Sequence, residues 1–561
     1  MIPRTRMILL AALTALAMPS LARSQAPNWP VRAVLRPGIV TTRQAITPAG
    51  EQSVFSGRVY SVAFGPSDHI VYAAFNSGAI YKLDWRSNRV LETIRDRRRV
   101  GMQGLILDPA THELLLSALQ SPSARRSERS AVQLVRIIGG RETVIADHLG
   151  TFAAGAISVA FARNANGERY AGVALTFDNA LAVVDVESGK VMGTVKTGVA
   201  PFGVALNRAG TVAYVSNWGG RFPRPGDLTL PEGNHQPHPR PVVVDARGIA
   251  STGTVSRVDL ATMKVTNAIE TGLHPTALYW DEPRSRLYVV NSNSDSVSVI
   301  NTEDNLVAQT IALHPFRGKA PGVAPNALAV SPDGETLYVA CGGINAVAVI
   351  RAVTGRVEGL IPTAWYPNDL RLSGDGKYLA VANLMGVGPG GAPRDVESLA
   401  RIEGLQNIMP GPSRRYVHSD RSSVEVIPVP GPAQLETYTV AVSENNHLPL
   451  AGSQPAPAFY SATLALKPLP VPLRAGEPSR IHHVVFIITE NRTYDQVLGD
   501  MPQGNGDPTL VEFGRGVTTN HHRLAEQFVL LDNFYADGGN SADGHQWLTQ
   551  AAETDYCYWP G

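Results

Sequence analysis

The chain has 561 residues, more than one hydrophobic core usually organises, so we expect at least two domains. Its 49 basic and 48 acidic residues leave a formal net charge of +1, which provides no field for gathering nucleic acid or anionic lipid. We therefore expect no nucleic-acid partner. The 44% hydrophobic content is ordinary for a globular protein.

Residues 1–22 have the pattern of a secretory signal peptide. Two arginines precede an apolar run from Met7 to Met18, and small residues follow up to Ala22. The run is shorter than the roughly 20 residues of a bilayer span. We therefore expect cleavage after Ala22 and no transmembrane anchor, with an uncleaved anchor as the alternative. The mature protein is then periplasmic or secreted.

A repeated pattern fills residues 57–442, after a lead-in at 23–56. Each unit has an apolar strand, a turn rich in Pro, Asp, Asn and Gly, a second strand, a short polar turn and a third strand. Alternating apolar and polar positions, as in SVSVI from Ser296 and AVAVI from Ala346, predict strands. The turns SPDG and SGDG have the Asp-Gly chemistry of tight hairpins.

Units of about 40 to 45 residues with about four strands each are typical of propeller blades. The pattern predicts seven blades, which begin near Val59, Gly101, Ile157, Gly203, Ala277, Ala327 and Asn368. The sequences YVSN, YVVN, YVAC and LAVAN, from Tyr214, Tyr288, Tyr338 and Leu379, resemble the YVTN family of propeller repeats. This resemblance implies a fold but no activity, because blade architecture hosts many functions.

Two long insertions, near 219–253 and 385–423, interrupt the blades. Long loops on a rigid scaffold often carry function, so a ligand or protein partner on the propeller loops is one expectation. The two cysteines fall in different predicted domains, which argues against a structural disulfide. Cys341, in the strand LYVACGG, is expected to be buried.

A Pro-rich linker at 443–480 separates the propeller from a C-terminal segment at 481–561. In this segment VVFII, Val484–Ile488, is an unbroken apolar run and predicts a strand covered on both faces. FVLLDNFY, from Phe528, predicts a second strand. SADGHQWLTQAAET, from Ser541, predicts a helix.

Two places in the segment are candidate functional sites, one for a cation and one for a phosphate. Glu490 and Asn491 follow the first predicted strand, where ligands bind in open α/β sheets, and their oxygens suit a divalent cation. The alternative for this pair is a helix cap or turn. Ser541 lies at a helix N-terminus, where backbone N–H groups and the helix dipole attract a phosphate oxygen. The alternative is that Ser541 only caps the helix.

ENRTYDQVLGD, then NHHRLAEQFVLLDNFY, then a Gly-rich turn with a hydroxyl residue occur in this order. The order resembles the N-terminal part of the phosphoesterase family that includes acid phosphatases and phospholipases C, within the alkaline-phosphatase-like superfamily. The whole chain is similar to bacterial proteins in which a YVTN propeller precedes such a domain. The resemblance implies a hydrolase acting on a phosphate-ester substrate, with a divalent metal cation held by Glu490 and Asn491 and with Ser541 as the nucleophile. His545, one turn after Ser541, is a candidate contact to the phosphate or leaving group.

The predicted fold is mainly β: a seven-bladed β-propeller followed by the N-terminal part of an α/β phosphoesterase domain. Residues 481–561 supply about two strands, and the later Asp and His ligands of the family have no matching positions. We therefore expect a truncated catalytic domain with little activity in this chain. The alternative function is a secreted propeller that binds a ligand or protein and carries an inactive tail.

Overall fold

In a computed structural model of the chain, the described residues are 29–34, 40, 42, 44–95, 99–120, 131–150, 159–164, 166–232, 240–317, 322–388, 421–451, 468–471, 478–534 and 541–550. The predicted signal peptide, most of the second insertion and Cys557 lie outside these ranges. Within them, no helix is long and apolar enough to cross a membrane.

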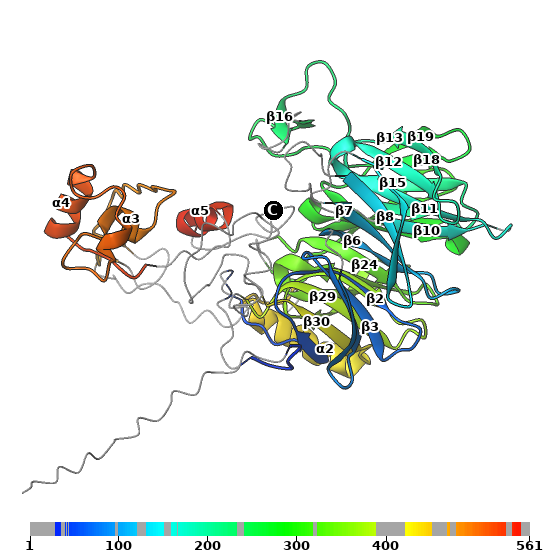
Figure 1. The fold of residues 1–561 in the computed structure, drawn as a ribbon, viewed down its shortest axis with the longest axis horizontal. Helices are drawn as coiled ribbons and strands as arrows, with labels where there is room; N and C mark the ends of the chain where they lie inside the picture. The colour runs from blue at the N-terminus through cyan, green and yellow to red at the C-terminus, as the bar shows by residue number, and fades with distance from the viewer. Residues whose placement is uncertain are drawn as a thin grey trace, which may run out of the picture.

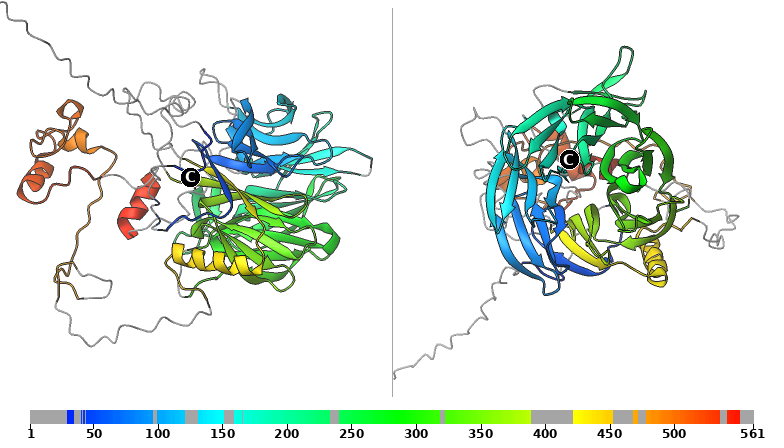
Figure 2. Two further views of the ribbon diagram at one scale, coloured as in Figure 1. Left: turned by 90° about the horizontal axis from the view of Figure 1, so that it is seen from below. Right: turned by 90° about the vertical axis from the view of Figure 1, so that its right-hand side faces the viewer.

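Seven four-stranded antiparallel sheets form a ring, which confirms the predicted seven-bladed propeller (Figure 1). The inner strands of neighbouring sheets contact one another around the ring, and β2 (Val59–Phe64) contacts β28 (Trp365–Leu372) to close it. The view along the ring in Figure 2 shows the sheets arranged around a common axis. Blades are numbered one to seven from β2.

The inner strands of blades one to seven are β2, β6 (Arg99–Leu107), β10 (Val159–Arg163), β14 (Val199–Leu206), β20 (Pro275–Asp281), β24 (Pro325–Val330) and β28. The second strands are β3 (Ile70–Phe75), β7 (Leu114–Gln120), β11 (Arg169–Leu175), β15 (Val212–Gly220), β21 (Arg286–Asn291), β25 (Thr336–Cys341) and β29 (Tyr378–Gly386). The third strands are β4 (Ala79–Asp84), β8 (Ala131–Ile138), β12 (Ala180–Asp185), β18 (Thr254–Asp259), β22 (Ser296–Asn301), β26 (Ala346–Arg351) and β30 (Ser423–Pro428). The outer strands are β5 (Arg89–Arg95), β9 (Arg141–Ala146), β13 (Val191–Lys196), β19 (Lys264–Glu270), β23 (Leu306–Ala312), β27 (Arg356–Pro362) and, in blade seven, β1 (Glu51–Val54).

Blade seven takes its outer strand from the segment expected as a lead-in. β1 pairs antiparallel with β30, and Glu51 lies opposite Val426. The residues before β1 are tied to blade six, where Gln44 Nε2 donates to the carbonyl O of Gly343 at 2.7 Å. A sheet built from both ends of the repeat holds the ring closed.

An asparagine of the second strand, Asn217, joins the middle strands of blade four. Asn217 Nδ2 donates to Thr254 Oγ1 at 3.1 Å and to Ser256 Oγ at 3.0 Å. Its Oδ1 accepts from the Gly198 N–H at 2.9 Å. The Asn of the repeated YVSN sequence therefore has a structural role, because it holds β15, β18 and the loop before β14 together.

Other blades have corresponding residues at the place of the asparagine and of its two third-strand partners. These residues are polar in some blades and apolar in others. Asn291 Nδ2 donates to two serines of β22 at 3.1 and 2.9 Å. In blade six the three corresponding positions are all apolar or weakly polar: Cys341, Ala346 and Ala348. The predicted burial of Cys341 is confirmed, its thiol is free, and burial raises the pKa of that thiol. All three polar residues are absent together in blade six, because a buried polar group without a hydrogen-bond partner lowers the stability of the fold.

Replacing Asn217 by alanine is expected to lower the free energy of unfolding by about 1–3 kcal/mol, because it leaves the buried partners of its amide unpaired. Urea denaturation followed by tryptophan fluorescence measures the loss. The combination Asn217→Cys, Thr254→Ala and Ser256→Ala reproduces the blade-six set and should recover part of it. A triple variant less stable than Asn217→Ala would contradict the hydrogen-bond explanation.

The axis of the ring is filled at the end where the inner strands begin. Phe202 and Trp365, from blades four and seven, belong to one buried apolar cluster. Gln103 of blade two donates through Nε2 to the carbonyl O atoms of Asn326 and Asn368, both at 2.9 Å. These contacts join blades that are not neighbours, so side chains pack across the axis at this end.

Two elements outside the seven sheets lie against them. The first predicted insertion contains the hairpin of β16 (Thr229–Glu232) and β17 (Arg240–Val243). Helix α2 (Pro432–Asn445) packs on β27, where a Cβ atom at Gly359 would approach Leu435 Cγ to 2.5 Å. Glycine at this place allows the close approach of the helix. Helix α2 crosses the expected start of the linker at residue 443.

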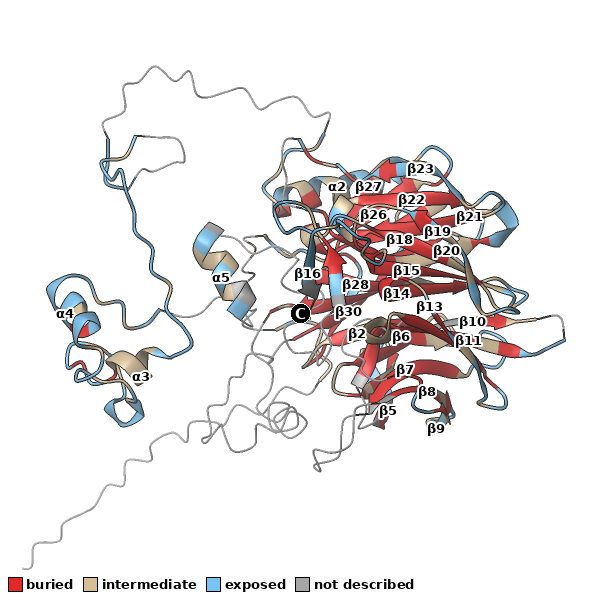
Figure 3. Ribbon diagram, turned by 90° about the horizontal axis from the view of Figure 1, so that it is seen from above, coloured by how far each residue is buried: buried red, intermediate tan, exposed pale blue. Residues whose placement is uncertain are grey.

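The C-terminal segment departs from its predicted strands. Its described residues, 481–534 and 541–550, contain no strand. VVFII has no regular secondary structure and no strand partner. Its side chains from Val484 to Ile487 are 61–85% exposed, and Phe528 is 73% exposed. Figure 3 shows this segment largely exposed beside the buried strands of the propeller. A strand needs a neighbour to bond its N–H and C=O groups, and no described segment pairs with either run. The predictions of a buried strand at VVFII and of a second strand from Phe528 were therefore wrong for the described residues.

Helices supply the regular structure of this segment. They are α3 (Tyr494–Leu498), the single turn η5 (Pro508–Leu510), α4 (Thr519–Gln527) and α5 (Ser541–Gln550). The predicted helix at Ser541 is confirmed. Polar contacts hold α3 and α4 together: the buried His522 Nε2 lies 2.7 Å from Asp500 Oδ1, and its hydrogen bond lowers the pKa of Asp500.

Candidate functional site

Ser541 is the first residue of α5, and its side chain is exposed. The first residues of a helix have N–H groups without intrahelical acceptors, and these groups carry the positive end of the helix dipole. A hydroxyl at this place is open to solvent and lies beside donors that suit a phosphoryl oxygen. The sequence predicts that Ser541 begins a helix, and in the structure Ser541 is the first residue of α5.

His545 lies one turn further along α5 and contacts both motifs. Its Nδ1 is 2.7 Å from the Ser541 carbonyl O and 3.6 Å from Glu490 Oε2. A proton on Nδ1 would be donated to these oxygens, and Nε2 would then remain an acceptor. The Glu-Asn motif and the helix that begins at Ser541 therefore meet through this histidine.

Asn491 follows Glu490 and leads through Arg492 into α3. Both Glu490 and Asn491 are exposed. Thr493 caps α3: its side chain accepts from the Gln496 N–H, and the Gln496 side chain accepts in return from the Thr493 N–H. This capping box fixes the start of the helix that directly follows the pair.

Glu490 and Asn491 suit the predicted cation in kind, because carboxylate and amide oxygens are the donors that hard divalent cations prefer. They are too few in number, since such a cation takes about six ligands. Within the part of the chain that the structure describes, no group of three or more His, Cys, Asp and Glu side chains could hold a metal ion. The donor set is therefore partial.

The structure brings three of the four predicted residues into one place: Glu490 and His545 are in contact, and His545 contacts the backbone of Ser541. The fourth, Asn491, is placed by its chain position beside Glu490. The sequence names these residues but does not predict the contact between Glu490 and His545. Helical and strand periodicities relate only positions close in the chain, and these two are far apart.

Comparisons with known proteins add little to this geometry. No protein-family profile and no curated protein matches the chain. Among solved structures, the chain is similar to hydrazine synthase of Kuenenia stuttgartiensis, at 16% sequence identity and a TM-score of 0.43, covering 62% of this chain and 96% of that one. A likeness of this size carries no argument, so the propeller assignment rests on the strand pairing.

Proposed function

We propose that this protein is an exported, metal-dependent phosphoesterase whose propeller binds or positions the substrate. The contact between Glu490 and His545 of α5 carries the proposal, because it joins the residues that the family resemblance assigns to the metal and to the nucleophile. The order of the three sequence motifs supports the same assignment. The signal-like sequence at residues 1–22 supports export and a periplasmic or secreted location.

Ser541 is the proposed nucleophile. Its Oγ forms a bond to phosphorus as the bond from phosphorus to the leaving alcohol breaks, and water then hydrolyses the seryl phosphate. The N–H groups at the start of α5 stabilise the phosphoryl oxygens. His545 contacts the phosphate, or its free Nε2 takes the proton of the Ser541 hydroxyl and returns it to the leaving alcohol. A divalent cation held by Glu490 and Asn491 would neutralise charge on the phosphate when bound.

A secreted propeller that binds a ligand or protein, with an inactive tail, is the second candidate. The exposed apolar side chains of Val484–Ile487 and Phe528 favour it, because a complete catalytic core would bury such groups. The partial donor set at Glu490 and Asn491 also favours it.

Hydrolysis of aryl phosphates distinguishes the two candidates. We expect the purified chain to release nitrophenol slowly from 4-nitrophenyl phosphate or from bis(4-nitrophenyl) phosphate, only with added Mg²⁺, Mn²⁺ or Zn²⁺, and not with a chelator. The ester that is cleaved identifies a monoesterase or a diesterase. Release that is equal with and without chelator would contradict the proposal.

Calorimetric titration with Mn²⁺ tests the metal site without relying on turnover. Glu490→Gln should weaken Mn²⁺ binding, because it removes the charge of the carboxylate ligand. Glu512→Gln is the matched control, since Glu512 is another exposed glutamate of the same segment. Equal binding by both variants, together with no hydrolysis of either ester, would favour the second candidate.

A further inference from the structure

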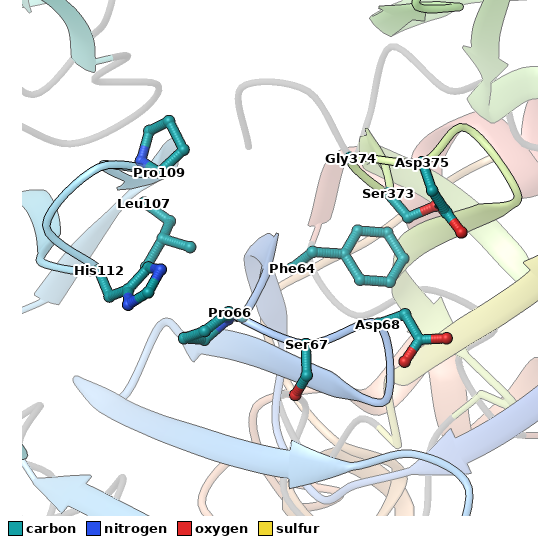
Figure 4. A pocket seen from close by; sticks show the side chains of 11 residues that line it. Phe64, Pro66, Ser67, Asp68, Leu107, Pro109, His112, Ser373, Gly374 and Asp375 are labelled. Carbon is teal, nitrogen blue, oxygen red and sulfur yellow. The ribbon is translucent and has the colours of Figure 1, made fainter.

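An open cavity of about 350 Å³ lies where the first turns of blades seven, one and two come together (Figure 4). Each of these turns joins the inner strand of its blade to the second strand. The cavity is therefore at the opposite end of the inner strands from the cluster that fills the axis. Its volume is in the range of small-molecule pockets, which begin at about 300 Å³.

The blade-one turn departs from the repeat at its first residue. In five other blades this position is Asp, Asn or Ser, and its side chain accepts from an N–H later in the same turn; the acceptors are Asp108, Asn164, Asn207, Ser331 and Ser373. In blade one the residue is Gly65, although its N–H makes the same hairpin bond, to the Ile70 carbonyl O at 2.8 Å. Glycine has no side chain, so this turn lacks the internal acceptor. The Ile70 N–H donates instead to the Ser67 carbonyl O at 3.0 Å, and the N–H groups of Ser67, Asp68 and His69 are left for water or a ligand.

An aromatic ring also distinguishes blade one. Phe64 is the last residue of its inner strand, where Leu107, Leu206 and Leu372 occupy the corresponding places in other blades. Phe64 lines the cavity, and Figure 4 shows its ring between His112 on one side and Asp68 and Asp375 on the other. A flat apolar surface therefore lies among hydrogen-bonding groups.

The acidic side of the cavity has no net charge. Asp375 Oδ2 is 3.0 Å from Lys377 Nζ, and Asp68 Oδ2 is 2.7 Å from Arg86 Nη2, so each carboxylate has its own cation. The hydrogen bond from Ser373 and the contacts of Lys377 lower the pKa of Asp375 to about 2, which keeps it an acceptor at neutral pH. These groups favour a neutral ligand with hydroxyl donors over a charged one.

We propose that this cavity binds a neutral sugar residue. The apolar C–H face of a pyranose ring packs on Phe64, as apolar rings do on aromatic side chains. Its hydroxyl groups donate to Asp68 and Asp375, and they accept from the uncapped amides of the blade-one turn and from His112. This site is independent of the phosphoesterase proposal, because none of its residues belongs to the C-terminal segment.

Saturation-transfer NMR with the full chain tests the proposal. The probes are the methyl glycosides of glucose, galactose, mannose and N-acetylglucosamine, with choline as a cationic comparison. We expect transfer to at least one glycoside and none to choline. Phe64→Leu should weaken binding about tenfold, because leucine keeps the apolar volume but not the flat ring. Leucine at this place is compatible with the fold, since three other blades have it.

Asp375→Asn provides the second variant and has a matched control. Asp333 has the same place in the blade-six turn, where Ser331 donates to it as Ser373 donates to Asp375. Asp375→Asn should weaken glycoside binding, and Asp333→Asn should leave it unchanged. No transfer to any of the four glycosides, binding of choline alone, or equal binding by Phe64→Leu and the unmodified chain would each overturn the proposal.

Discussion

The Glu425→Gln variant is expected to be more stable than the unmodified chain at pH 7 by a few kcal/mol, with the difference vanishing near pH 4. Glu425 is a fully buried residue of β30. Burial raises its pKa from 4.5 to about 8, although the Asn383 side chain and the Ala364 N–H, which donates to Glu425 Oε1 at 3.0 Å, act in the opposite direction. The folded chain therefore keeps this proton at neutral pH.

The sign of the effect follows from proton binding in the two states. Between about pH 4.5 and pH 8 the unfolded chain releases the proton that the folded chain keeps, so ionisation stabilises the unfolded state. The contribution of Glu425 to the free energy of unfolding is full below pH 4.5 and is lost above about pH 8. Between these values it falls by up to about 1.4 kcal/mol for each unit of pH. Glutamine has no proton to release, so the unfolding free energy of the variant does not show this decrease with pH.

Urea denaturation at pH 5, 6, 7 and 8 measures the difference in unfolding free energy between the two proteins. Subtracting the unfolding free energy of one protein from that of the other removes the contributions of all other titrating groups. Glu335→Gln is the control, because Glu335 is exposed and its ion pair with Arg351 lies at the surface. A stability difference for Glu425→Gln that does not grow from pH 5 to pH 8 would show that the buried carboxyl is not protonated.

Local patterns explain why most of the propeller can be predicted from sequence. β22 alternates serine with valine, and β26 alternates alanine with valine. The turns SPDG and SGDG have Gly334 and Gly376 at φ of 70° and 74°, where glycine is favoured. β1 could not be predicted in this way. Its four residues have no pattern of their own and become a strand only by pairing with β30.

The C-terminal segment shows the limit of the same reasoning. Helix α5 could be predicted because its backbone hydrogen bonds lie within the segment. VVFII has high strand propensity, but a strand forms only with a partner, so Val484–Ile488 is unpaired and has no regular secondary structure. The contact between Glu490 and His545 depends on the whole path of the chain between them, which no local pattern describes.

Departures from a repeat are more informative about function than the repeat itself. The repeated asparagines and turn residues build blades, whereas Gly65 leaves one turn uncapped beside a cavity. Glu425 introduces a buried acid where blades four and five have serine. Both departures are visible when the blades are aligned with one another. Their consequences become clear only when the structure shows what surrounds them.

Replacing Ser541 by alanine is expected to reduce metal-dependent hydrolysis of an aryl phosphate to the level seen with chelator. Loss of a catalytic nucleophile lowers turnover by roughly 10³-fold or more, because the enzyme can no longer form the covalent intermediate. Thr549→Ala is the matched control: Thr549 is an exposed hydroxyl residue of the same helix, and its Oγ1 donates to the His545 carbonyl O at 2.8 Å. Equal losses in both variants would indicate a damaged helix rather than a missing nucleophile.

A trapped intermediate provides a readout that does not depend on fast turnover. Attack by Ser541 Oγ forms the bond to phosphorus while the aryl oxide leaves, so acid quenching should preserve a phosphoryl group on the peptide that contains Ser541. The adduct accumulates where its hydrolysis is slower than its formation, and mass spectrometry then detects it. A phosphoryl group on a different residue would contradict the assignment of Ser541. Hydrolysis without any adduct would instead indicate direct attack by water, and the serine would then serve only as the cap of α5.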